Sequence, residues 1–106
     1  MSFPDLMILF ILCHALADYP LQGDYLSKAK AGLIPGANRH YALFMHSSIH
    51  AGLVFLISHS YIITAGELLI HYVTDELKVK HKISYALDQA IHLTCKVIWA
   101  ALLVIS

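Results

Sequence analysis

The sequence predicts an all-α fold: an integral membrane four-helix bundle that forms a single domain over residues 1–106. Hydrophobic residues make up 58% of the chain and charged residues only 13%, so polar side chains are too few to cover a water-soluble domain of this length. The apolar residues gather in four long segments, which short polar stretches separate. Three of these segments approach the ~20 residues that a helix needs to cross ~30 Å of hydrocarbon.

The first helix is predicted at residues 4–19, because Pro4 suits a first helical turn and Pro20 cannot continue an established helix. Residues 21–40 are rich in glycine and also contain a proline, so we expect a loop with room for a short interfacial helix. The other helices are predicted at residues 41–58, 62–78 and 85–105. Tight polar turns are expected at residues 59–60 and 80–84.

Basic residues lie in two of the three connections, and this distribution predicts an orientation. Apart from Lys96, the lysines and arginines are Lys28, Lys30, Arg39, Lys78, Lys80 and Lys82. They fall in the first and third connections, which share one side of the membrane in a protein with four spans. Cytoplasmic loops are enriched in lysine and arginine. We therefore expect these connections in the cytoplasm, and both termini on the non-cytoplasmic side of the inner (plasma) membrane.

Charge and cysteine usage exclude several classes of protein. Seven basic residues balance seven acidic ones without forming a basic stripe, so no nucleic-acid partner is expected. Cys13 and Cys95 lie singly in apolar segments, which predicts buried free thiols. Membrane lipid is the expected partner. Gly52 and Gly66 offer small surfaces for helix contacts, including those of a homo-oligomer.

Each predicted helix carries one pair of histidine or aspartate residues at positions i and i+4. An ionisable group in hydrocarbon costs roughly 2.5 to 3.5 kcal/mol, so it usually faces a partner or a cavity. The spacing puts both members of a pair on one face of the helix. Because successive helices alternate in direction, all four pairs fall at the cytoplasmic end, and we expect a single cluster. Its eight members are His14, Asp18, His46, His50, His71, Asp75, Asp88 and His92.

This cluster is predicted to bind metal. Three carboxylates in a low-dielectric layer repel one another unless cations balance them, and a metal ion supplies that balance. Five imidazoles with three carboxylates suit Zn²⁺, with iron or manganese as the alternative, whereas Ca²⁺ and Mg²⁺ favour oxygen ligands. Eight ligands exceed one tetrahedral site. Two bridged metals fit this count, and so does one metal with the remaining groups as base and supporting partners.

Other polar residues surround the predicted site. Lys78 and Lys28 are candidate anion binders, although both also obey the charge rule and could extend to lipid headgroups. Deeper in the bilayer, Glu67 and Lys96 are predicted to pair and to close the site from the outer side. Two amides are expected at the cytoplasmic mouth of the cluster: Gln22 and Gln89.

At these residues the chain resembles a known family. The segments HALADYPLQ (14–22), HSSIH (46–50), HYVTDELK (71–78) and DQAIH (88–92) resemble the signature of the domain of unknown function 3307 family. The resemblance implies a small membrane protein of bacteria or phages, and it covers nearly the whole chain, with Tyr19 where phenylalanine is expected. More loosely, the HxxxD elements are similar to those of SOS-associated inner-membrane metal-dependent hydrolases.

The leading expectation is a metal-dependent hydrolase that acts on a lipid headgroup or phosphoester at the cytoplasmic leaflet. Asp18, Asp75 or Asp88 would act as general base and Lys78 would hold an anionic substrate. The sequence lacks a GxSxG nucleophile motif, so activated water is the simpler nucleophile. The alternatives are a metal-ion or proton transport protein, an oxidative iron site, and a non-enzymatic phage or bacterial interaction protein with a structural metal.

Overall fold

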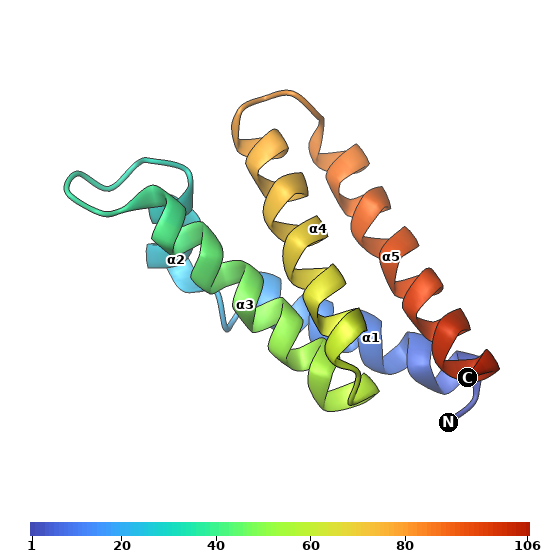
Figure 1. Ribbon diagram of the computed structural model, residues 1–106. Coiled ribbons are helices and arrows are strands. Elements are labelled where there is room, and N and C mark those ends of the chain that lie inside the picture. Colours follow the sequence, from blue (N-terminus) through green and yellow to red (C-terminus); the bar gives the residue numbers. More distant parts are fainter.

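The computed structural model describes residues 1–106 and is all-α, with five helices and no strand. The helices are α1 (Phe3–Asp18), α2 (Gly23–Lys30), α3 (Arg39–Ser58), α4 (Tyr61–Val79) and α5 (Tyr85–Ile105) (Figure 1). The four long helices begin and end within two residues of the predicted positions. The short helix α2 lies in the segment for which the sequence predicted a loop with room for such a helix.

Polar N-caps fix where the helices begin. Ser2 accepts a hydrogen bond from the backbone N–H of Asp5, whose carboxylate accepts one from the backbone N–H of Ser2. The remaining long helices are capped by the side chains of Asn38, Ser60 and Ser84. The Asn38 cap starts α3 two residues before the predicted position. His59 adopts a left-handed conformation with φ of 52°, which lets the chain reverse between α3 and α4.

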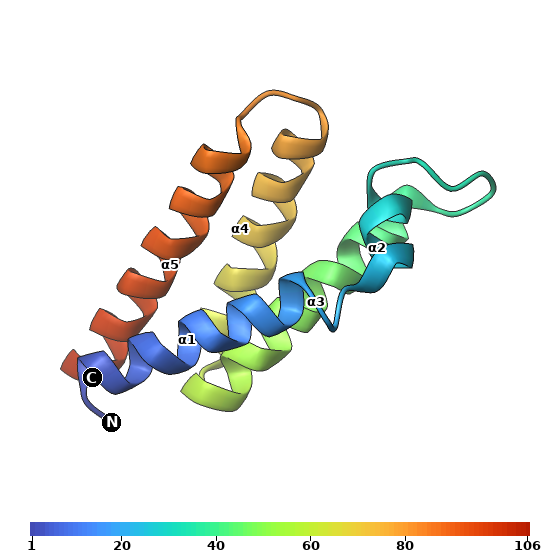
Figure 2. The ribbon, with the colours of Figure 1, turned by 180° about the vertical axis from the view of Figure 1, so that it is seen from behind.

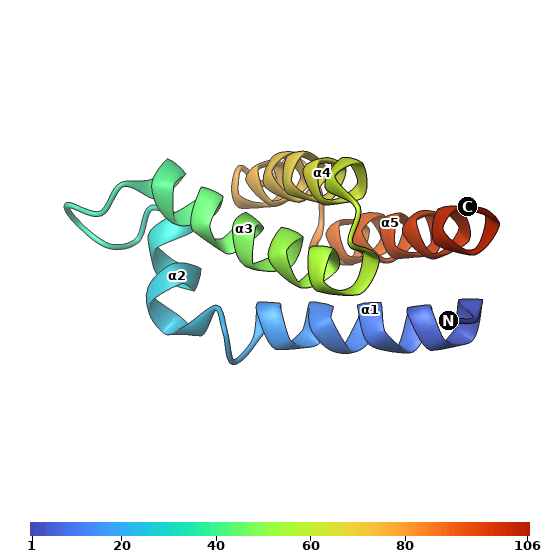
Figure 3. The ribbon, with the colours of Figure 1, turned by 60° about the horizontal axis from the view of Figure 1, so that its bottom comes forward.

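The four long helices run alternately in opposite directions, so that both chain ends lie at the same end of the molecule (Figures 1 and 2). Helix α1 packs against α3 and α5, and α4 packs against the same two helices. Helix α2 turns by 80° from α1 and packs against α3 (Figure 3). This turn brings α2 beside the end of the molecule where α1 ends and α3 begins.

The interior of the protein is unusually polar, and its exterior is apolar. Of the 23 buried residues, 12 are polar or charged. Large apolar side chains cover the outside, including Ile8, Leu56 and Leu69, each 66% exposed. A water-soluble protein places its charged residues outside and its large apolar residues inside. Hydrocarbon removes the cost of an apolar exterior, so this arrangement is consistent with a membrane location.

Two helices, α3 and α5, are long and apolar enough to cross a membrane. Helices α1 and α2 meet the same description only together, as one broken span. Helix α4 does not, because its 19 residues include four charged ones: Glu67, Asp75, Glu76 and Lys78. The structure therefore supports two spanning helices, or three with the broken pair, and the predicted count of four spans stays a prediction.

The interior divides along its length into an apolar end and a polar end. The apolar end lies near the termini and contains Leu6, Phe10, Val54, Ile63 and Ala100. Trp99 packs against this core and faces α4 at Gly66, where an added Cβ would lie 3.0 Å from the ring carbon Cη2. The missing side chain of Gly66 therefore allows α4 and α5 to approach each other at Trp99.

A buried ion pair separates this apolar core from the polar end. The Lys96 Nζ on α5 donates a hydrogen bond of 2.5 Å to the Glu67 Oε1 on α4. The Trp99 Nε1 donates to the same oxygen at 3.2 Å. Glu67 and Lys96 are at most 1% exposed, so each charge depends on the other for its compensation. The predicted pairing of Glu67 with Lys96 is confirmed.

Replacing Gly66 by valine should destabilise the protein, because the new side chain meets the Trp99 ring. Overpacking of this kind costs about 1–3 kcal/mol, which should appear as a lower unfolding midpoint in detergent. Gly52→Val is the matched control, since no atom lies within 4 Å of the position of its Cβ. Equal effects of the two substitutions would contradict the close packing of α4 against α5.

Lys96→Met should be strongly destabilising, because it leaves the Glu67 carboxylate buried without a cation. Removal of one partner of a buried pair costs about 3–5 kcal/mol. The double variant Lys96→Met, Glu67→Gln should recover much of this loss, which a double-mutant cycle of unfolding free energies measures. Lys80→Met is the control, because Lys80 is exposed and its pairing with Glu76 should be worth little. A double variant no more stable than Lys96→Met would contradict the pairing energy.

Candidate metal centre

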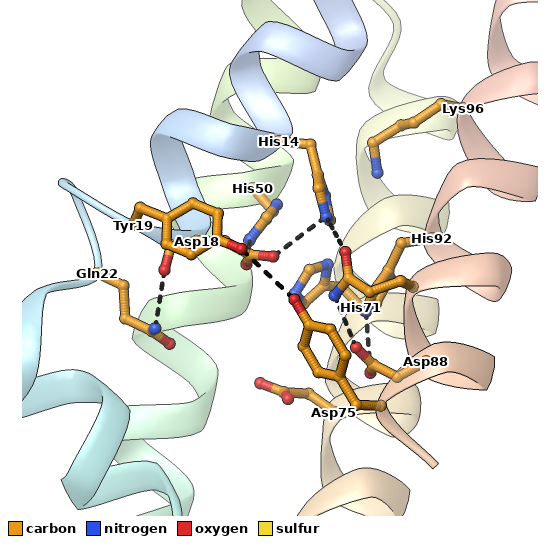
Figure 4. A network of polar contacts seen from close by, with 12 residues as sticks. His14, Asp18, Tyr19, Gln22, His50, His71, Asp75, Asp88, His92 and Lys96 are labelled. Carbon is orange, nitrogen blue, oxygen red and sulfur yellow. Dashed lines mark hydrogen bonds and ion pairs between the residues drawn. The ribbon is translucent and has the colours of Figure 1, made fainter. Parts of the chain in front are cut away.

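All eight residues of the predicted cluster lie at the polar end of the molecule, where the four long helices converge. Figure 4 labels all of them except His46. We call these eight residues the His/Asp cluster. Its five imidazole rings are each at most 8% exposed. The neighbouring rings have centroid separations of 3.7 to 6.5 Å, and the closest pair is His50 with His71. The i, i+4 pairs of four separate helices therefore contribute to one buried centre.

Four members of the cluster place one ligand atom each within 4.8 Å of all the others. We call this set the Asp18 group; its members are Asp18, His46, His50 and His71. The Asp18 Oδ1 lies 2.8 Å from the His50 Nε2 and 3.5 Å from the His46 Nε2. The Nε2 atoms of His46 and His71 are 3.4 Å apart. Three imidazoles and one carboxylate form a donor set that fits Zn²⁺.

Two carboxylates of the cluster are engaged by lysines. The Lys30 Nζ donates to the Asp75 Oδ2 at 2.8 Å, and the Lys78 Nζ lies 3.1 Å from the Asp75 Oδ1. The Lys78 Nζ also lies 3.9 Å from the Asp88 Oδ2. From the sequence we expect a metal ion to balance all three carboxylates of the cluster. The structure instead supplies ammonium groups for two of them.

Asp18 is the carboxylate that has no lysine partner. Its Oδ2 lies 3.1 Å from the His14 Nε2, and its Oδ1 faces His46 and His50. Its side chain is 19% exposed, more than any imidazole of the cluster. The need for an added cation is therefore greatest at Asp18, where three imidazoles are also available as ligands.

Four residues that the sequence predicted as metal ligands lie outside the Asp18 group: His14, Asp75, Asp88 and His92. The His14 Nε2 lies 3.1 Å from both the Asp18 Oδ2 and the Gln89 Oε1, so this ring supports Asp18 from the side. The Gln89 Nε2 in turn donates to the Asp88 Oδ2 at 3.0 Å. Gln89, an amide predicted at the mouth of the cluster, therefore links Asp88 to His14 and through His14 to Asp18.

A cavity of about 260 Å³ adjoins the cluster. Its 13 lining residues include three carboxylates, Asp18, Asp75 and Asp88, and two lysines, Lys30 and Lys78. Two exposed tyrosines also line it, Tyr19 directly after α1 and Tyr85 at the start of α5, and their hydroxyl groups lie 3.4 Å apart at the edge of the cavity. Only two of the lining residues are hydrophobic, so the cavity suits a polar or anionic molecule.

Lys30, at the end of α2, is a site residue that was not predicted from the sequence. Lys30 is buried and lines the cavity, whereas Lys28, the predicted anion binder, is exposed. Lys30 reaches Asp75, 45 residues further along the chain, because α2 turns back against α3. No local spacing in the sequence indicates that contact. The sequence contains one indication of this contact: Asp75 lies in a predicted span and would need a second cation besides Lys78.

The other predicted residues at the mouth take part in the site. Gln22 lines the cavity, and its Nε2 donates to the backbone carbonyl of Asp18 at 3.0 Å. Lys78 lines the cavity as predicted, and its side chain is 27% exposed. Its ammonium group is shared between Asp75 and Asp88, so an anion in the cavity would compete with these carboxylates.

Comparison with known proteins identifies the family. No curated protein and no solved structure matches the chain, so the looser likeness to metal-dependent hydrolases is not shown. The family described as Protein of unknown function (DUF3307) matches residues 6–106. This match includes every residue of the His/Asp cluster and the whole cavity lining. The chain belongs to the DUF3307 family.

Proposed function

We propose that this protein is a membrane-embedded metal-dependent hydrolase that acts on a lipid headgroup or phosphoester at the cytoplasmic leaflet. The observation that carries the proposal is the Asp18 group, four buried or half-buried ligands beside a polar cavity. Zn²⁺ is the simplest ion for three imidazoles and one carboxylate, with iron or manganese as the alternative.

The spacing of the ligand atoms supports a tetrahedral ion. Bonds of about 2.0–2.1 Å in a tetrahedral zinc site separate neighbouring ligand atoms by about 3.3–3.4 Å. Within the Asp18 group, three separations are 2.8, 3.5 and 3.4 Å. The side chains of His50 and His71 stack at a centroid distance of 3.7 Å, so an ion in the plane of both rings requires them to turn apart.

The distribution of charge and apolar surface supports the membrane placement. Large apolar side chains cover the exterior around the buried polar interior. An exterior of this kind is stable in apolar surroundings. The cavity lies at the end of the molecule that carries the basic connections, with Lys80 and Lys82 between α4 and α5. By the positive-inside rule this end faces the cytoplasm. We infer that the termini lie on the opposite side of the inner membrane.

The cavity supports the chemistry of hydrolysis. A metal held by the Asp18 group would lower the pKa of a coordinated water toward ~7 and make it a nucleophile. Asp88 is the candidate general base, because it lines the cavity and its Oδ1 makes no hydrogen bond. Lys78 and Lys30 would attract an anionic phosphate, and Asp75 would hold both ammonium groups in place. A phosphoester at headgroup depth fits these positive groups.

His46→Gln should remove about one equivalent of zinc per chain relative to the wild type, because the substitution deletes an imidazole ligand of the Asp18 group. Elemental analysis of detergent-purified protein, after zinc loading and removal of free metal, measures the change. His40→Gln is the control on the same helix, since the His40 side chain is 63% exposed and lies outside the Asp18 group. Equal zinc content in all three proteins, including none, would remove the metal site from the proposal.

Zinc-loaded protein in lipid vesicles should release phosphate from a phosphomonoester lipid such as phosphatidic acid. Asp88→Asn should lower the rate by roughly 10²–10⁴-fold if Asp88 is the general base, while zinc content is unchanged. Asp24→Asn, at an exposed position on α2, should retain the wild-type rate. Full activity after chelation of the metal would contradict the mechanism. Stoichiometric zinc without turnover of a panel of phosphoester lipids would favour a structural metal instead.

A further inference from the structure

A second set of ligand atoms lies on the other side of His71 from the Asp18 group. Glu67, His71 and His92 each place one ligand atom within 4.8 Å of the other two, and all three residues are buried. We call these three residues the Glu67 group. His71 belongs to both groups. Its Nε2 lies 3.4 Å from the His46 Nε2, whereas its Nδ1 lies 3.4 Å from the Glu67 Oε2.

The Glu67 group contains three buried polar atoms that have no hydrogen-bond partner. They are the Oε2 of Glu67, the Nδ1 of His71 and the Nδ1 of His92. An unsatisfied buried polar atom costs about 1–3 kcal/mol, so one such atom on each of the three residues indicates that a ligand belongs to this group. The other oxygen of Glu67 is engaged by Lys96 and Trp99, which leaves Oε2 to act as a single-oxygen ligand.

The distance between Glu67 and His71 suits an ion better than a direct contact. The Glu67 Oε2 and the His71 Nδ1 lie 3.4 Å apart, yet they form no hydrogen bond. A metal with bonds of about 2.1 Å to both atoms would span this separation at roughly the tetrahedral angle. His71 and His92 also line the cavity, from which water can supply a remaining ligand.

We propose that the protein holds two divalent metal ions and that the imidazole ring of His71 bridges them. This inference rests on the proposed metal site of the Asp18 group and adds the Glu67 group as a second site. A ring that binds one ion through Nε2 and another through Nδ1 has lost its remaining N–H proton. That proton passes to water in the cavity. The resulting negative charge on the bridge offsets part of the charge of the second ion.

Two bound ions would also change the charge of the molecule that the cavity binds best. The carboxylates in and around the cluster are Asp18, Glu67, Asp75 and Asp88, and the lysines paired with them are Lys30, Lys78 and Lys96. One carboxylate is therefore in excess before any metal binds. Two divalent ions and one deprotonated bridge reverse this balance to a net positive charge. The filled centre would then favour an anion such as a phosphoester over a neutral substrate.

Zinc stoichiometry of the full chain in detergent tests the second site. The wild type should bind two zinc ions per chain, and His92→Gln and Glu67→Gln should each bind one. Glu76→Gln is the matched control on α4, because Arg39 holds the Glu76 carboxylate away from the cluster. It should bind two. His92→Gln leaves the pair of Glu67 with Lys96 intact, so it decides the question if Glu67→Gln does not fold.

Every other result overturns the proposed second site, and some results also contradict the proposed function. One zinc ion in the wild type that His92→Gln retains would remove the second site and leave the Asp18 group standing. Loss of all zinc in His92→Gln and Glu67→Gln would mean that these residues only orient His71. Two ions in every variant would place the second ion elsewhere. No zinc in the wild type would remove both proposals.

The bridge has its own spectroscopic test. In protein loaded with two Cu²⁺ ions per chain, spin coupling through the His71 ring should lower the electron paramagnetic resonance intensity below that of two isolated ions. His92→Gln should bind one Cu²⁺ ion and give the full intensity of a single uncoupled ion. Full intensity from both ions in the wild type would overturn the shared ligand.

Discussion

Compensation of buried charge inside an apolar shell is the constraint on which the structure depends. Three lysines enter the interior from α2, α4 and α5, and their ammonium groups lie against carboxylates on α4 and α5. Without these contacts the carboxylates would each carry a large desolvation penalty. The pairs between α2 and α4 and between α4 and α5 therefore hold helices together as well as balancing charge. Helix α4, with four charged residues, is tolerated among apolar helices because its neighbours supply the partners.

The same compensation determines where a metal is needed. Asp75 and Glu67 each have a lysine within 2.8 Å, so neither requires a metal for its charge. Asp18 has only imidazole partners, and imidazoles bind metals as neutral ligands. The structure thus separates the carboxylates that a lysine compensates from Asp18, which has no lysine partner. A count of acidic residues in the sequence cannot make this distinction, because it depends on which lysines reach the interior.

Much of the site could be predicted from the sequence, because the i, i+4 pairs and the alternation of helix direction involve only local geometry. His14 and Asp18 share a face of α1 for that reason. The antiparallel order of the helices then places His14 beside His92 of α5. The contact of Lys30 with Asp75 could not be predicted, since it depends on an 80° turn between α1 and α2. Nor did the apolar pattern reveal that α4 is too charged to qualify as a span by itself.

The two tyrosines at the cavity edge have a consequence for how a lipid could approach. Tyr19 and Tyr85 are both exposed, and their hydroxyl groups meet between the end of α1 and the start of α5. Tyrosine rings in membrane proteins prefer the level of the headgroups, with the hydroxyl toward water. With the protein in a membrane as proposed, the edge of the cavity at these two rings would lie at the depth of the phospholipid headgroups. A lipid that moved sideways between the two rings could present its phosphate to the interior while its acyl chains stayed among those of its neighbours.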